Sequence, residues 1–260
     1  MLTADPKQRF SNRVDDYARY RPGYPPAVIE LLRRDCGLTP DSIVADIGSG
    51  TGLLSQLFLA NGNPVYGVEP NAAMREAGER QLRKYTRFRG VAGSAESTTL
   101  AAASVGFVVA GQSFHWFKPA AARAEFQRIL NPGGWVAVIW NERKKDSTPF
   151  LRAYGALIQE YGTDYAGVAA TYLEYERSDE FFGIGARREK SFPNEQTFDW
   201  KGLCGRLLSS SYAPRENHPR HEPMLAELAR IFEEHNENGI VRFEYDTRIF
   251  YGHLGSDRTT

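Results

Sequence analysis

Three glycines at alternate positions, Gly48, Gly50 and Gly52, point most directly to chemistry in this chain. They stand between a short apolar run with one acid, residues 44–47, and an apolar helix-like run, residues 53–59. This order predicts a strand, a tight turn and a helix. Because glycine turns the backbone at positive φ and presents no side chain, a flat ligand can lie against such a turn.

An acid at the end of the next apolar run extends this interpretation. Glu69 follows residues 65–68, and the tip of the second strand is where a ribose offers its hydroxyl groups to an acid. The spacing G-x-G-x-G differs from the G-x-G-x-x-G of dinucleotide-binding turns. A pyrophosphate needs a helix N-terminus aimed at its charge, whereas a cofactor without phosphate needs only a close backbone approach and carboxylates.

Short apolar runs alternate with helical patterns over the first half of the chain. A helix is expected from Pro25 and Pro26 to about Cys36, with the prolines in its first turn. The other elements expected here are strands at 43–47, 65–68, 88–92, 105–110 and 134–140, and helices at 53–61, 71–84 and 119–130. The alternation predicts an α/β fold with a doubly wound, mostly parallel sheet.

The alternation ends after Trp140. Residues 148–182 have the pattern of two amphipathic helices without a strand between them. The remaining elements expected are a strand at 187–192, helices at 200–210 and 222–237, and a strand over 240–251. We therefore expect helical insertions between the fifth and the later strands, forming a cap.

The composition narrows the class of protein. The 260 residues are 42% hydrophobic and 12% aromatic, which allows a sizeable core in one domain, or in one domain with a smaller cap. Lysine plus arginine equals aspartate plus glutamate, 32 against 32, so a nucleic-acid partner is not expected. Neither a long apolar run nor a signal-peptide pattern is present, so we expect no membrane partner.

Cysteine and histidine positions bear on compartment and metal binding. Cys36 and Cys204 are too few and too far apart for a disulfide framework or a zinc site, which favours a cytoplasmic location. His218 and His221 lie in a proline-rich stretch without a third nearby ligand, so no metal is expected.

Five stretches in order resemble one known family. Residues 44–52 resemble the first motif of class I S-adenosylmethionine-dependent methyltransferases, and the other four are Val68-Glu-Pro70, Gly93-Ser-Ala-Glu96, Gly111-Gln-Ser-Phe-His-Trp116 and Leu130-Asn-Pro-Gly-Gly134. More narrowly, residues 17–25 and Phe114-His-Trp116 resemble the type 11 small-molecule branch, near the trans-aconitate methyltransferase-like enzymes. The resemblance implies a seven-stranded Rossmann-like sheet, S-adenosyl-L-methionine as cofactor and a small-molecule acceptor.

The resemblance also assigns cofactor contacts by position. It implies that Glu69 accepts the ribose hydroxyls and that Tyr17 and Arg21 cover the site as a lid. Two departures are Gly106 and Ser94, where many relatives carry aspartate. The full set of cofactor-binding positions implied is Tyr17, Arg21, Asp46, Gly48, Ser49, Gly50, Glu69, Pro70, Met74, Ser94, Ala95, Glu96, Gly111 and Gln112.

The methyl acceptor is less well specified. A sulfonium methyl is already activated, so an enzyme can work by aligning the nucleophile at about 3 Å and excluding water. A carboxylate acceptor is ionised at neutral pH and needs only a cation or donors, for which Arg21, Arg143 and His115 are candidates. For an amine or phenol, His115 could instead remove the proton.

The candidate acceptor-facing residues each have an ordinary structural alternative. His115 and Trp116 could simply form an aromatic pair, Trp140 could belong to the core, and Arg143 could lie in a solvated loop. The acceptor-facing set nevertheless comprises His115, Trp116, Trp140 and Arg143, with His115 the one candidate for a catalytic role.

The expected organisation has four parts, and two other functions stay open. The parts are a lid and first helix (1–36), a cofactor-binding core (37–145), a helical insertion (146–185) and a completion of the sheet (186–260). One alternative is a sensor that binds the cofactor without turnover. The other, a nicotinamide-dependent oxidoreductase, is disfavoured because neither Tyr154 nor Tyr161 begins a Tyr-x-x-x-Lys pair. The oligomeric state is left open.

Overall fold

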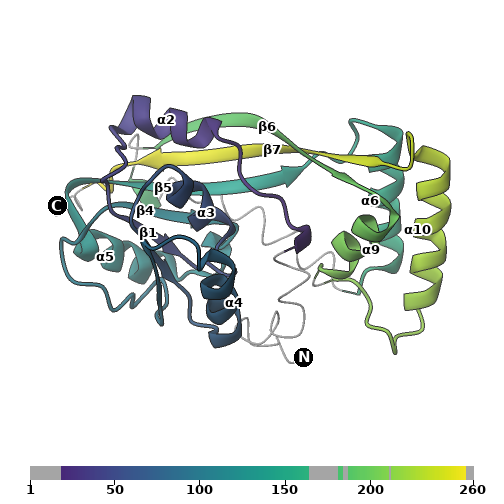
Figure 1. Ribbon diagram of the computed structural model, residues 1–260, viewed down its shortest axis with the longest axis horizontal. Coiled ribbons are helices and arrows are strands. Elements are labelled where there is room, and N and C mark those ends of the chain that lie inside the picture. The colour runs from purple at the N-terminus through teal and green to yellow at the C-terminus, as the bar shows by residue number, and fades with distance from the viewer. Residues whose placement is uncertain (1–18, 164–180, 184–186, 211, 256–260) are drawn as a thin grey trace.

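The structure, a computed structural model, describes residues 19–163, 181–183, 187–210 and 212–255 (Figure 1). Its elements follow the expected order of alternating strands and helices. They are α2 (Ala27–Cys36), β1 (Val44–Ile47), α3 (Leu53–Ala60), β2 (Val65–Val68), α4 (Ala72–Leu82), β3 (Phe88–Val91), β4 (Val105–Gly111), the short 3-10 helix η1 (Phe114–Trp116), α5 (Pro119–Ile129), β5 (Leu130–Arg143), α6 (Pro149–Tyr161), β6 (Arg188–Phe198), α9 (Trp200–Leu208), α10 (His221–His235) and β7 (Val241–Gly252).

The strands form one seven-stranded sheet in the order β3-β2-β1-β4-β5-β7-β6. Strands β1 to β5 run parallel, while β7 is antiparallel to both β5 and β6. The prediction of a doubly wound, mostly parallel sheet is therefore confirmed. The strand order reverses between β1 and β4, and ligands of open α/β sheets bind at the carboxyl ends of the strands beside such a reversal.

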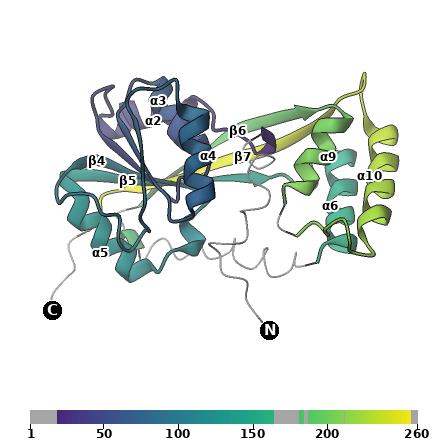
Figure 2. The same cartoon turned by 60° about the horizontal axis from the view of Figure 1, so that its bottom comes forward.

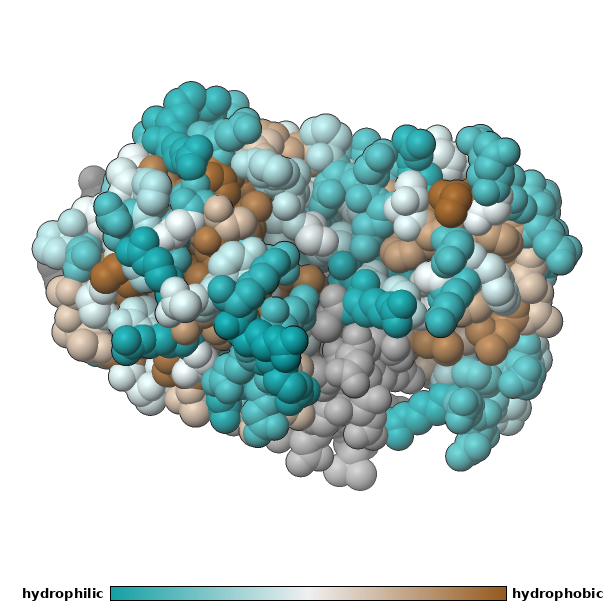
Figure 3. All heavy atoms as spheres, viewed as in Figure 1, coloured by the Kyte–Doolittle hydropathy of each residue, from teal (hydrophilic) through white to brown (hydrophobic). Residues whose placement is uncertain are grey.

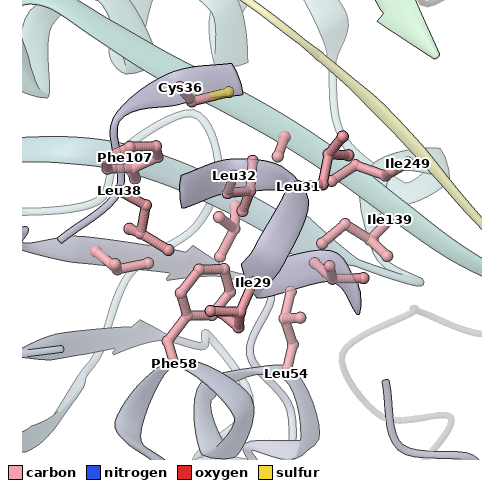
Figure 4. Packing of buried hydrophobic residues seen from close by; sticks show 14 of the residues in the cluster. Ile29, Leu31, Leu32, Cys36, Leu38, Leu54, Phe58, Phe107, Ile139 and Ile249 are labelled. Atoms are coloured by element: carbon pink, nitrogen blue, oxygen red, sulfur yellow. The ribbon is translucent and has the colours of Figure 1, made fainter. Parts of the chain in front are cut away.

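Alternate residues of the strands face opposite layers. On β5, Ala137 and Ile139 join the cluster that packs under α2 and α3, which Figure 4 shows from close by. Val138 and Trp140 join the cluster on the other face, under α5. This period-two division makes both faces of the parallel strands buried, as a doubly wound sheet requires.

Strand β5 is longer than the sequence predicts. The expected start was 134, but Leu130 already pairs with Val105, and the register then shifts so that Trp135 pairs with Phe107. The intervening residues 131–134 bulge out of the ladder. Beyond Ile139, which pairs with Gly111 at the end of β4, residues 140–143 pair only with β7. Strand β6 likewise continues to Phe198 rather than ending at 192.

The extended ends of β5, β7 and β6 carry α6, α9 and α10, which we call the helical lobe (Figures 1 and 2). Its buried side chains form a cluster of their own, which includes Leu157, Leu203, Leu228 and Phe243. Helix α6 confirms the first helix expected within 148–182. The second falls mostly within 164–180, outside the described residues.

The visible surface is mixed in character. In the view of Figure 3, hydrophilic side chains dominate over both the sheet-bearing part and the helical lobe, with apolar side chains scattered among them. Over the described residues, none of the helices combines the length and the apolar character that crossing a membrane requires.

Phe243 tests whether the lobe and the sheet unfold together. It is fully buried, and its ring meets Phe150, Tyr154 and Phe198 at centroid distances of 5.2, 4.8 and 5.5 Å. We expect Phe243→Ala to lower the free energy of unfolding by about 3–5 kcal/mol in urea denaturation. Ile240→Ala, at a position that is 40% exposed, should change it by less than about 0.5 kcal/mol. A loss below 1 kcal/mol at Phe243 would mean that the lobe does not unfold cooperatively with the sheet.

Candidate functional site

The glycine turn after β1 has the geometry that its composition predicts. Gly48, Gly50 and Gly52 have φ values of 68°, 56° and 85°, in the region that favours glycine. A Cβ on Gly48 would lie 2.6 Å from Cβ of Ser113, so that side of the turn is closed. A Cβ on Gly50 would meet only Cε of Met74, at 3.4 Å. At Gly50 a Cβ-sized group would therefore fit in van der Waals contact with Met74 of α4, so this position is less crowded than Gly48.

Glu69 joins this turn to helix α4. Its side chain is 8% exposed, Oε2 accepts a hydrogen bond from N of Gly50 at 3.0 Å, and Oε1 accepts one from N of Asn71 at 2.8 Å. Burial raises the pKa of Glu69, and the two backbone donors oppose that rise. A carboxylate can accept about four hydrogen bonds, so lone pairs remain for further hydroxyl donors.

Asp46 lies deeper, on β1. It is 1% exposed, and Oδ2 accepts a hydrogen bond from Oγ of Ser55 at 2.6 Å, which ties the start of α3 to the strand. Within the described residues Oδ1 has no hydrogen-bond partner. Burial raises the pKa of Asp46 to about 7, the Ser55 hydrogen bonds oppose this, and the nearby Glu69 charge adds to it.

The candidates expected at the adenine edge occupy a tight turn after β3. Ser94 and Ser97 exchange backbone hydrogen bonds of 3.0 and 3.2 Å. Ala95 is buried, and Oε1 of Glu96 accepts a hydrogen bond from N of Lys118 at 2.9 Å, which links this turn to the start of α5. Of the two residues expected beside them, Met74 is buried and Pro70 is exposed.

The loop after β4 places Gln112 in an unusual environment. Its φ of 55° is rare for a residue other than glycine. Its backbone N donates to O of Ile139, and its Nε2 donates to O of Asn141, both at 3.0 Å. Its Oε1 is buried and lacks a hydrogen-bond partner in the part of the chain that the structure describes. A buried acceptor held in this way fits a site where a ligand supplies the donor.

His115, Trp116 and Trp140 form one aromatic group. The His115 ring lies 4.5 Å from the Trp116 ring and 5.3 Å from the Trp140 ring, both in tilted geometry. Trp140 is 1% exposed and packs in the core, whereas Trp116 is 39% exposed. Trp140 therefore backs the histidine from inside the fold, and Trp116 flanks it from the surface.

Residues 19–24, which we call the strap, run from the helical lobe to the end of β4. The Tyr20 ring lies against Gly205 of α9, Nη2 of Arg21 donates to O of Ser209 at 3.1 Å, and Oη of Tyr24 lies against Gly111. The strap thus covers the carboxyl end of the strand that precedes Gln112. Tyr17, the other residue expected in a lid, lies outside the described residues.

Three polar side chains that the sequence analysis missed hold this strap. Nδ2 of Asn141 and Nδ2 of Asn194 donate to O of Gly23 at 3.0 and 2.9 Å. Oγ1 of Thr247 donates to Oδ1 of Asn141 at 2.6 Å. The three residues come from β5, β6 and β7, so no pattern along the chain joins them, and only the pairing of these strands does.

Arg143 lies in the helical lobe and does not contact the glycine turn. Its guanidinium is 5.1 Å from the centroid of the Tyr154 ring on α6, and its Nη1 reaches O of Leu151 at 3.5 Å. A second arginine, Arg206 of α9, is buried in the same lobe. Its signal in the sequence is a charged residue on the apolar face of a predicted helix, beside Leu203 and Leu207.

Comparisons with known proteins agree with this fold. Residues 45–138 match the methyltransferase domain family. An uncharacterised methyltransferase-like protein of Schizosaccharomyces pombe is 26% identical over 250 residues, 93% of each chain. An uncharacterised methyltransferase of Mycobacterium tuberculosis is 33% identical over 153 residues, 59% of this chain and 60% of that protein. A solved structure from Anaeromyxobacter dehalogenans, assigned as a type II methyltransferase, has a TM-score of 0.67 at 20% identity, covering 90% of this chain and 98% of its own.

The sheet order and the glycine turn with its acid define the class I methyltransferase fold. Residues 45–138 thus carry a methyltransferase domain, and this match, the similar proteins and the fold together support a methyltransferase that uses S-adenosylmethionine. The residues present fit that cofactor: Glu69 keeps acceptor capacity for ribose hydroxyls, and Oδ1 of Asp46 and Oε1 of Gln112 are buried acceptors without partners among the described residues.

The pKa of Asp46 gives a prediction about stability. Between about pH 4 and pH 7 the folded protein holds a proton on Asp46 that the unfolded chain has lost, so the stability contributed by this group falls as pH rises. Asp46→Asn stays neutral, and its amide oxygen can still accept from Ser55. From pH 5 to pH 8, urea denaturation should show the variant gaining at least about 1 kcal/mol relative to the native chain. The exposed Asp41→Asn serves as control, and a pH-independent difference at Asp46 would contradict the raised pKa.

Proposed function

We propose that the protein methylates a small molecule and that the reacting group of this acceptor is a carboxylate. The observation that carries the proposal is the strap, which lies across the end of β4 and is held there by Asn141 and Asn194. A peptide segment so close to the reacting region suits a small acceptor. The guanidinium groups of Arg21 and Arg143, both near Tyr212 in the same region, suit a negatively charged one.

The proposed cofactor site is built on the glycine turn. We assign Gly48, Ser49 and Gly50 to the amino-acid part of the cofactor, with Asp46 below them, and Glu69 to the ribose. The adenine would lie among Pro70, Met74, Ser94, Ala95 and Glu96, the methionine part beside Gly111 and Gln112, and the lid would comprise Tyr17 and Arg21. The less crowded position at Gly50, beside Met74, and the remaining lone pairs of Glu69 support this assignment.

When bound, the cofactor supplies a methyl group activated by the positive charge of its sulfonium. The chain's own residues would then orient the acceptor and exclude water. Tyr24 and Gln112 border the end of β4, and the His115 ring, backed by Trp140 and flanked by Trp116, borders it through η1. An ionised carboxylate has no proton to lose, so His115 would donate a hydrogen bond to it and not act as a base.

The proposed division of labour follows the four parts of the chain. Residues 37–145 bind the cofactor, 1–36 cover it, and 146–185 with 186–260 form the acceptor side. Helix α6, from the third part, packs with α10 and β7, from the fourth, in one buried cluster. We further propose a cytoplasmic location, which the free thiols of Cys36 and Cys204 support.

Glu69→Gln tests the ribose assignment. The amide nitrogen would face a backbone N–H of Gly50 or Asn71, and one charged acceptor for hydroxyl groups would be lost. We expect the dissociation constant for S-adenosylmethionine, measured by calorimetry, to rise at least about ten-fold, equivalent to roughly 1.4 kcal/mol. Glu233→Gln, on the exposed side of α10, should bind as the native chain does. Unchanged affinity in a folded Glu69→Gln protein would remove Glu69 from the site.

A release assay for S-adenosylhomocysteine tests the acceptor class. We expect turnover with carboxylic acids, and little with phenols or amines, in a panel of small compounds. His115→Gln should lower kcat for an acid by less than about three-fold, because no proton is removed, whereas a base would be worth about 100-fold or more. Turnover confined to phenols or amines, lost in His115→Gln, would replace the carboxylate proposal with general-base methylation. Cofactor binding without any turnover would favour a sensor.

A further inference from the structure

Arg206 is a buried positive charge in the helical lobe. It is 5% exposed, its Nε lies 3.4 Å from Oη of Tyr245, and its Nη1 donates to Oγ of Ser210 at 3.2 Å. Across the described residues, no carboxylate lies within ion-pair distance of Arg206 or of Arg143. Burying a guanidinium is costly unless an anion compensates it.

Tyr154 supplies a second, independent observation. Its side chain is fully buried, and Oη has no hydrogen-bond partner within the ranges that the structure describes. Burial raises the pKa of Tyr154, so the hydroxyl stays protonated and can donate. The guanidinium of Arg143 lies over the same ring at 5.1 Å. Among the described residues, this buried donor beside two cations has no acceptor, although buried polar groups are normally satisfied.

The surroundings of these residues are electropositive. Burial would raise the pKa of Tyr212, but Arg206, Arg21 and Arg143 hold it below its usual value. Hydroxyls of Tyr245 and Ser210 lie beside Arg206, and Oη of Tyr245 donates to Oε1 of Gln196 at 3.0 Å. The described side chains here thus offer positive charge and O–H donors, which is the donor set that binds an oxyanion.

Arg206, Arg143 and Tyr154 lie at some distance from the end of β4, where the methyl group would be transferred, but one elongated ligand could reach both places. Arg143 pairs with Tyr245, whereas Gly111, at the end of β4, pairs with Ile139. The strand rise places these two levels about 13 Å apart along β5. The strap runs between the helical lobe and the end of β4, because Arg21 donates to O of Ser209 after α9 and Tyr24 lies against Gly111.

We propose that Arg206, Arg143 and Tyr154 bind an anionic oxygen group, a carboxylate or phosphate, at the end of the acceptor remote from the atom that receives the methyl group. The acceptor is then an elongated acid whose second anionic group anchors it in the helical lobe. That the ligand is the acceptor rests on the proposed function, while the anion site itself can be tested without turnover.

Thermal unfolding with added anions tests the site directly. We expect the Tm of the native chain to rise saturably with adipate or inorganic phosphate, compared with chloride at equal ionic strength. The anion that gives half of the maximal rise in Tm at the lower concentration shows whether the site prefers a carboxylate or a phosphate. Equal responses to both anions and to chloride would overturn the proposal.

Two tyrosine variants carry the decisive comparison. Tyr154→Phe removes only the unpartnered hydroxyl, so without anion its Tm should be equal or higher, while the concentration for half-maximal anion response should rise at least ten-fold. Tyr245→Phe removes a hydroxyl bonded to Gln196 and Arg206, so its Tm should fall without anion. An unchanged anion response in Tyr154→Phe would show that the Tyr154 hydroxyl does not bind the anion.

Arg206→Met completes the test, with Arg206→Lys as the variant that keeps the charge if the first fails to fold. We expect the anion response to be lost in Arg206→Met and weakened in Arg206→Lys, with S-adenosylmethionine affinity unchanged in both.

In the release assay, KM for a diacid should rise at least ten-fold in Tyr154→Phe at constant kcat. If Arg206→Met loses the anion response but the native chain shows no turnover, the anion site stands and the proposed function is refuted. If Arg206→Lys turns over diacids as the native chain does, the proposed function stands and the anion site is refuted.

Discussion

The antiparallel pairing of β5 with β7 beyond the end of β4 is the constraint on which the rest of the molecule depends. Parallel pairing with β4 stops at Ile139, but β5 continues to Arg143 against β7, and β6 lies on the far side of β7. These extended ends carry the helical lobe and place Asn141, Asn194 and Thr247 side by side. The strap, and with it the cover over the end of β4, is held by those three side chains.

Buried charge is treated differently in the two parts of the molecule. In the sheet-bearing part, Asp46 and Glu69 are buried but accept hydrogen bonds from Ser55, Gly50 and Asn71, which join β1, α3 and α4 around the glycine turn. In the helical lobe, the side-chain hydrogen bonds of Arg206 to described residues go to the hydroxyls of Tyr245 and Ser210. The first arrangement holds a turn in place, and the second favours an anion from outside.

The parallel part of the fold could be predicted from the sequence because its signals are local. Strands β1, β2 and β4 are short apolar runs bounded by glycine, proline or an acid, and burial on both faces makes such runs easy to recognise. The boundaries of β5 and β6 could not be predicted in this way. Residues 131–134 have the composition of a turn, yet Leu130 before them still pairs with Val105, because a bulge lets the strand resume at Trp135.

What the sequence by itself determined is the glycine turn, its acid Glu69 and hence the kind of cofactor, because positive φ and a carboxylate at a strand tip are properties of single residues. The tertiary structure alone decided where Arg143 and Arg206 lie and what holds the strap. A guanidinium's role depends on which charges share its surroundings, and those come from α6, α9 and β7, elements far apart along the chain. Arg143 lies over Tyr154 because β5 carries it past the end of β4.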